Sequence, residues 1–257
     1  MKFLHAATQK NRITLAMLLT VAALPVCAQS QNVPDMAPKA WRFQATPYVW
    51  MTGLRGNVRP VQGAPTVHVN NSFSEVLENL DAAFFLNATA RKDRWVLHGD
   101  LSHAATSDSV ELPLGLTANA QVKQSSLSLL GGYTWLPKPD ATVDLMAGMR
   151  WWRIRAEVKI PPVLQASSNT SFVDPVLAIR WYQDWAPRWS TMVYGDVGGF
   201  GIGSHSTWQA VGTLNYQMTP QAYLSLGYRY LSVDYRKNGK SLDFSMSGPM
   251  LGATWRF

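Results

Sequence analysis

Cysteine is nearly absent from this sequence, and its one cysteine, Cys27, lies near the N-terminus. Once the first 28 residues are removed, no disulfide can form and no chemistry that depends on a thiolate is available. The charged residues also form no basic cluster and no basic helical face. Lys and Arg number 23, and Asp and Glu number 16. We therefore expect no nucleic-acid partner.

Long hydrophobic runs are absent after residue 28, although hydrophobic residues make up 47% of the chain. A membrane-spanning helix needs about 20 consecutive apolar residues. Two classes remain, a soluble all-β protein and a transmembrane barrel, because only helices and closed barrels satisfy their backbone polar groups in lipid.

The N-terminus has the pattern of a secretory signal peptide. Lys2, Lys10 and Arg12 precede an apolar run, Ile13 to Leu24, which is followed by a small-residue cleavage site ending at Ala28. We predict a cleaved signal over residues 1–28. A lipoprotein signal is the alternative, but Leu24-Pro25-Val26 lacks the small residue expected just before a lipidated Cys27.

Segments of alternating polarity recur along the rest of the chain, separated by short turns that alternate with longer, more polar connections. Short connections that alternate with long ones are typical of bacterial outer-membrane barrels. We expect ten strands, with eight or twelve as alternatives because the stretch 55–73 could pair into the wall. The predicted strands lie near 41–54, 82–91, 95–107, 118–135, 141–158, 171–183, 188–200, 206–218, 221–235 and 241–257.

Each predicted strand has one apolar face and one mixed face. In the run 141–152, for example, Leu145 and Met149 point one way while Asp144 and Arg150 point the other. Aromatic residues gather on the apolar faces near the short turns, as in the girdles of membrane barrels, and this favours an apolar exterior. The predicted girdle comprises Trp95, Trp135, Trp181, Trp189, Tyr216, Trp255 and Phe257.

Several stretches resemble a group of small Gram-negative outer-membrane β-barrel proteins, within the broader OmpA-like and opacity-like barrels. The stretches are "ATPYVWMTGLRGNV" (45–58), "SFSEVLENLDAAF" (72–84), "YGDVGGFGIGSHSTWQA" (194–210), "GYRYLSVDY" (227–235) and "SGPMLGATWRF" (247–257). The resemblance implies an all-β, antiparallel up-and-down barrel over 41–257, preceded by a short periplasmic segment, 29–40. It brings no assigned reaction or ligand.

The resemblance also implies that Trp255 and Phe257 act as a C-terminal assembly signal read by the barrel-assembly machinery. Lipopolysaccharide and phospholipid are the lipid partners that an outer-membrane location implies.

The inward faces carry ten charged residues that could pair across the lumen. Two interpretations stay open: an ion-pair network that fills and stiffens the barrel, and a constricted, charge-lined pore. We favour the network. Its predicted members are Arg42, Arg91, Asp100, Asp144, Arg150, Asp174, Arg180, Asp196, Arg229 and Arg256.

Catalytic candidates are weak. His98 and Asp100 share a strand face with Ser102, so a nucleophile or water could be activated there, and His205 lies in a predicted outer loop. No Gly-x-Ser-x-Gly motif is present. His98 and His103 point to opposite faces of one strand, so we predict neither a metal site nor a cofactor.

One helix is predicted near 72–80, where Phe73, Val76 and Leu80 have helical spacing and Ser72 and Glu75 occupy capping-box positions. It either packs as part of a loop or plugs the outer mouth. For the whole chain we expect a non-enzymatic barrel with a structural or surface role, or a narrow passive channel. The alternative is an enzyme that acts on lipid or peptide at the outer rim.

Overall fold

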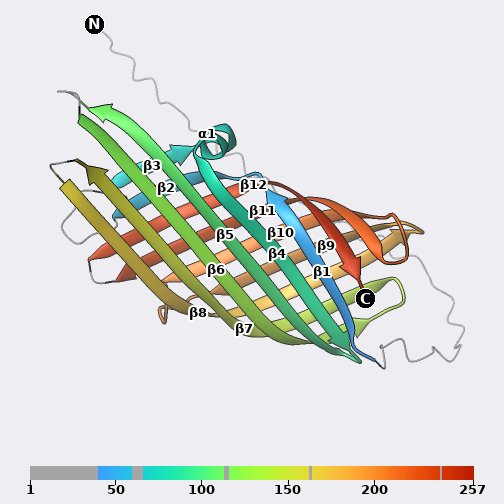
Figure 1. The fold of residues 1–257 in the computed structure, drawn as a ribbon. Helices are drawn as coiled ribbons and strands as arrows, with labels where there is room; N and C mark the ends of the chain where they lie inside the picture. The colour runs from blue at the N-terminus through green and yellow to red at the C-terminus, as the bar shows by residue number, and fades with distance from the viewer. Residues whose placement is uncertain (1–39, 60–65, 113–115, 162–163, 238) are drawn as a thin grey trace, which may run out of the picture. The chain divides into compact units, whose positions relative to one another are not determined.

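Ten antiparallel strands close into a barrel in a computed structural model that describes residues 40–59, 66–112, 116–161, 164–237 and 239–257 (Figure 1). The predicted signal peptide and residues 29–39 lie outside this range. Pairing of the first strand with the last closes the barrel, so the predicted fold class is confirmed. The barrel strands are β1 (Arg42–Trp50), β4 (Leu80–Lys92), β5 (Trp95–Leu112), β6 (Leu116–Pro137), β7 (Ala141–Ile160), β8 (Leu164–Ala186), β9 (Trp189–Gly198), β10 (Ser206–Gln217), β11 (Ala222–Lys237) and β12 (Lys240–Arg256).

The exterior of the barrel is apolar and its interior contains the charges. On β7, Met149 is 64% exposed while its neighbour Arg150 is 1% exposed, and Leu129 of β6 is 60% exposed beside a buried Ser128. A soluble barrel would show the reverse distribution. No helix in the described part of the chain has the length and apolar character to cross a bilayer.

A hairpin extends the wall at one end of the barrel. β2 (Gly53–Arg59) continues the path of β1 along β12, since Trp50 is opposite Met250 and Gly53 is opposite Ser247. β3 (Val67–Asn71) then pairs with β2. The stretch 55–73 therefore does add strands to the sheet, but only ten of the twelve strands close the barrel.

A seam between β1 and β4 follows from this arrangement. Their described pairing ends at Pro47 opposite Leu86, where proline has no N–H to donate. Beyond that point β1 continues into β2 along β12, and β2 pairs with β3 instead of β4. The inner side of the seam is covered by the Phe85 ring, which stacks on Tyr48 with 5.3 Å between centroids.

The strands β5 to β8 are longer than predicted. The polar stretches Thr106–Thr117 and Lys159–Thr170, which we expected to be outer loops, are mostly strand, because β5 pairs with β6 as far as Leu112 and β7 pairs with β8 as far as Ile160. Serine, threonine and asparagine are polar enough to resemble a loop, yet backbone pairing between two long neighbours holds them in a sheet.

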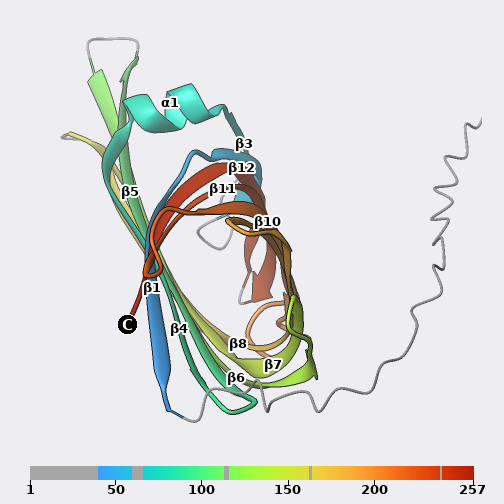
Figure 2. The same ribbon diagram turned by 90° about the vertical axis from the view of Figure 1, so that its right-hand side faces the viewer.

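The predicted helix is present as α1 (Phe73–Glu78). The Ser72 side chain caps it, and the Glu75 carboxylate accepts hydrogen bonds from the Ser72 backbone N–H (2.6 Å) and hydroxyl (2.8 Å). None of its residues is buried, and it lies at the same end of the barrel as the long β5–β6 hairpin (Figure 2). The helix is therefore a rim element that does not enter the lumen.

The barrel closure leads to a first prediction. The backbone groups of Phe257 and Phe43 form two hydrogen bonds, of 2.9 and 3.0 Å, and their rings stack at 6.2 Å. Phe257→Ala should lower the fraction of chain that folds, measured as the heat-modifiable band on unboiled gels, because the ring contact at the closing strand pair is lost. Phe257→Tyr keeps this contact and should fold normally; equal folding of all three chains would contradict the prediction.

A second prediction concerns the helix cap. The hydrogen bonds from Ser72 lower the pKa of Glu75, so they stabilise α1 above the ordinary glutamate pKa of about 4.3 and are lost as pH falls through the lowered value. Amide hydrogen exchange at Val76 and Asn79, corrected for intrinsic rates, should accelerate only when the pH falls below the lowered pKa of Glu75. Glu75→Gln should remove this pH dependence; a profile that is unchanged by the substitution would disprove the assignment.

Candidate functional site

The middle of the lumen is filled by arginine–aspartate pairs, and the pair formed by Arg150 and Asp196 is the most completely buried. Both guanidinium Nη atoms of Arg150 donate to the Asp196 carboxylate, one of them at 3.1 Å, and the two side chains are 1% and 0% exposed. The Nε of Arg150 donates to Ser128 Oγ at 2.8 Å. Such a bidentate pair fixes orientation as well as charge.

A second group is centred on Asp144 of β7, which has no exposed surface. Its carboxylate accepts hydrogen bonds from Arg91 Nη1 (3.0 Å), Arg180 Nε (3.0 Å) and Thr134 Oγ1 (2.8 Å). Arg180 also donates to Thr89 Oγ1 at 3.1 Å. Since Thr89 is on β4 and Arg180 is on β8, this group links strands that are four positions apart in the wall.

A third group joins β11, β5 and β1. Arg229 donates to Asp100 Oδ1 at 3.1 Å and also to the Tyr48 hydroxyl, which donates in turn to Asp100 Oδ2 at 3.0 Å. The Arg229 guanidinium lies 4.8 Å from the centre of the Trp50 ring. The three groups together brace the cylinder across its lumen at mid-height.

An aromatic and aliphatic cluster lies beside these pairs, toward the end that carries α1. Trp152 has no exposed surface, and Phe172 stacks between Trp152 at 6.1 Å and Tyr235 at 4.6 Å. Side chains from several strands of the barrel meet here and pack into one buried cluster. The buried members are Tyr48, Trp50, Phe85, Trp152, Ile154, Phe172, Leu231, Val233, Tyr235, Leu242, Phe244 and Met246.

Three members of the predicted charge network lie apart from the ion pairs. Asp174 instead accepts hydrogen bonds from the Ser204 backbone N–H (2.6 Å) and hydroxyl (2.9 Å), which ties down the β9–β10 connection. Arg256 donates to the Tyr223 hydroxyl at 2.7 Å, and Arg42 is exposed at the start of β1. Arg42 and Arg256 lie near the ends of their strands, and no ion pair is described for either.

No described hydrogen bond joins the catalytic candidates directly. His98 contacts Thr89 and Arg180 at 3.3 Å through Nδ1, and Asp100 is held by Arg229 and Tyr48. Asn87 Nδ2 lies between the two candidates, 3.3 Å from His98 Nε2 and 3.5 Å from Asp100 Oδ2. Ser102 bonds to Ser126 instead, at 2.7 Å. His98, Asp100 and Ser102 are all buried in the lumen.

His205 lies elsewhere, exposed in the β9–β10 connection, where its backbone contacts Asp234 and Gly201. Within the described residues, no group of three or more His, Cys, Asp or Glu side chains could hold a metal ion.

The predicted girdle residues lie on the outward face. Trp135 and Phe257 are each 68% exposed, and Trp95 packs edge-on against Tyr133 at 5.6 Å. Trp189 lies between Trp185 and Tyr216 in a row of rings. The sequence pattern missed Trp41, Phe43, Tyr133 and Trp185; Tyr133 could have been found, because it shares a strand face with Trp135.

The comparisons with known proteins support the architecture. No protein-family model and no curated protein match the chain. The outer membrane protease OmpT from Escherichia coli has a similar structure, with 11% identity and a TM-score of 0.51, and the match covers 84% of this chain and 97% of that one. The translocator domain of the autotransporter NalP from Neisseria meningitidis gives 12% identity, 84% and 88% coverage and a TM-score of 0.46. With its apolar exterior and closed ten-strand wall, the chain is an integral β-barrel of the Gram-negative outer-membrane type.

Proposed function

We propose that this chain is a closed, non-enzymatic outer-membrane barrel whose role is structural or is carried out at the cell surface. One observation supports this most strongly: the side chains that would line a pore, such as Asp144, Arg150 and Trp152, are at most 1% exposed. In an open channel these side chains would contact water. The passive-channel interpretation is therefore the less favoured one.

The long strands support a role at the surface. A tilted strand of about 10 residues is enough to cross the outer membrane. β6 has 22 residues and β8 has 23, whereas β9 has 10 and β10 has 12. One side of the barrel therefore extends beyond the membrane as a polar sheet, which is available for contact with molecules outside the cell.

The enzyme alternative receives little support. His98, Asp100 and Ser102 are buried and bonded to other partners, and no hydrogen bond or ion pair of the exposed His205 side chain is described. The proposal includes lipopolysaccharide and phospholipid as lipid partners and the barrel-assembly machinery as the partner during insertion.

Bilayer recordings test the closed lumen. Folded protein inserted into planar bilayers should give no steady ion current above that of a protein-free bilayer, because the ion pairs and the aromatic cluster block the path. Replacement of residues 70–80 by a short glycine linker should leave the current unchanged, since α1 lies at the rim. A stable single-channel conductance in the unmodified chain would contradict the proposal.

The bracing role of Asp144 gives a stability prediction. Asp144→Ala leaves Arg91 and Arg180 without their shared carboxylate, and loss of one partner of a buried pair costs about 3–5 kcal/mol. The unfolding temperature of the β-sheet, followed by circular dichroism, should fall markedly. Asp243→Ala removes an exposed carboxylate on β12 and serves as the matched control. Equal melting of the two variants would show that the pair contributes nothing to stability.

A further inference from the structure

The outward face of β7 changes from apolar to basic at Trp151. Below this residue, toward the girdle at the short turns, Leu145 and Met149 are 47% and 64% exposed, and Trp151 itself is 36% exposed. Above it the outward positions are Arg153, Arg155, Glu157 and Lys159. The Trp151 Nε1 donates to Ser171 Oγ at 3.1 Å, so the indole turns its polar edge toward β8 and its apolar body toward the band. This is the orientation of an aromatic residue at a membrane interface.

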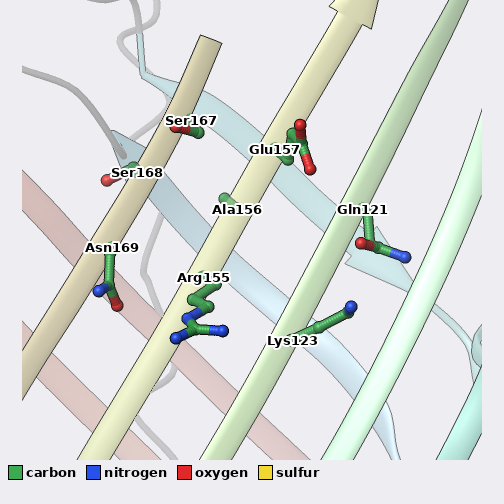
Figure 3. Close-up of a pocket in the computed structure, with 8 residues that line it drawn as sticks. All are labelled: Gln121, Lys123, Arg155, Ala156, Glu157, Ser167, Ser168 and Asn169. Carbon is green, nitrogen blue, oxygen red and sulfur yellow. The ribbon is translucent and has the colours of Figure 1, made fainter.

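Two cations are placed side by side immediately above that boundary. Arg155 of β7 is directly opposite Lys123 of β6, and Arg153 precedes Arg155 on the same face. Figure 3 shows Arg155 between Lys123 on one neighbouring strand and Asn169 on the other. No hydrogen bond or ion pair is described for the side chains of Lys123, Arg153 or Arg155. Like charges directly opposite each other destabilise a sheet, so a bound anion would stabilise this arrangement.

One nearby carboxylate, Glu157, is shared among several cations, and Lys123 is one of them. Glu157 binds Lys159 Nζ at 2.8 Å and Gln165 Nε2 at 3.2 Å. The hydrogen bond from Lys159 is the main cause of its lowered pKa, so Glu157 is ionised at neutral pH but already paired. One carboxylate among four cations, Lys123, Arg153, Arg155 and Lys159, leaves an excess of positive charge at the interface.

The position and the charge together select the ligand. An anion at this height would lie just above lipid chains that contact Leu129, Met149 and Leu177, which are all more than half exposed on the same three strands. A phosphate attached to a lipid satisfies both requirements. Arginine binds phosphate through its planar fork, and Asn169 and Ser167 add polar contacts at the edge of the same surface.

We propose that Lys123, Arg153 and Arg155 form a binding site for the phosphate groups of lipopolysaccharide in the outer leaflet. The lipid's acyl chains then lie against the apolar face below Trp151. This site rests on the proposed function, because it places the β5–β8 side of the barrel at the outer rim, and it identifies which surface holds the lipid partner.

Binding in nanodiscs tests the site. The folded chain would be placed in phosphatidylcholine nanodiscs, and fluorescent lipopolysaccharide would be titrated in. The triple variant Lys123→Gln/Arg153→Gln/Arg155→Gln should bind about 100-fold more weakly, since each basic residue near an anionic lipid surface contributes a factor of roughly five. The control, Arg55→Gln/Arg59→Gln/Arg236→Gln, removes the same number of charges from other outward positions and should bind like the unmodified chain.

Two further arms identify the ligand. Dephosphorylated lipopolysaccharide should bind the unmodified chain and the triple variant equally weakly. Millimolar inorganic phosphate should not displace intact lipopolysaccharide from the unmodified chain. The site is refuted if the two triple variants bind equally, if dephosphorylation has no effect, or if free phosphate competes as well as the lipid does. Ion current measured on the same purified chains in planar bilayers reports separately on the closed barrel, so failure of the site and failure of the proposed function give different results.

Discussion

Arginine–aspartate pairs inside the cylinder are the interaction on which the rest of this structure depends. A barrel with an apolar exterior must put its polar side chains inside, and there each charge needs a partner because it is removed from water. Arg150 with Asp196, Arg180 with Asp144 and Arg229 with Asp100 meet that need. Arg180 and Asp144 are on adjacent strands and Arg150 and Asp196 are two strands apart, whereas Arg229 of β11 reaches across to Asp100 of β5, so the same bonds that neutralise the charges also tie strands of the wall together.

The proposed closed lumen implies that the protein makes its functional contacts on its outer surface. The two sides of the barrel differ in height, since β5 to β8 are long and β9 and β10 are short. On the tall side, Trp151 separates lipid-facing residues from polar and basic ones. The side chains of Lys123 and Arg155 lie where a lipid headgroup would be found. In this account the interior provides stability, and the taller outer wall provides the contacts with lipid and with molecules at the surface.

Strand alternation was enough to predict the faces of the barrel but not the bonding partners inside it. The two-residue period correctly placed Asp144 and Arg150 on the same face, and the turn residues located most strand ends. Asp174, however, is directly opposite Arg150 in the register, yet Arg150 binds Asp196 and Asp174 binds Ser204. Choice among lumen partners depends on side-chain reach across a closed cylinder, which a strand pattern does not contain. The length of β5 to β8 was missed for a different reason, because polar strands outside the membrane have the composition of loops.

Accessibility of a single cysteine tests the closed lumen most directly. Ser126 lies on the lumen face at 3% exposure, and Ser167 is exposed on the outer wall. Each would be changed to cysteine in a chain that lacks Cys27, and the folded protein in lipid would be treated with a charged, water-soluble maleimide. The account predicts rapid labelling of Ser167→Cys and no labelling of Ser126→Cys until the barrel is unfolded. Labelling of both positions at similar rates in the folded protein would show a water-filled lumen and contradict the account.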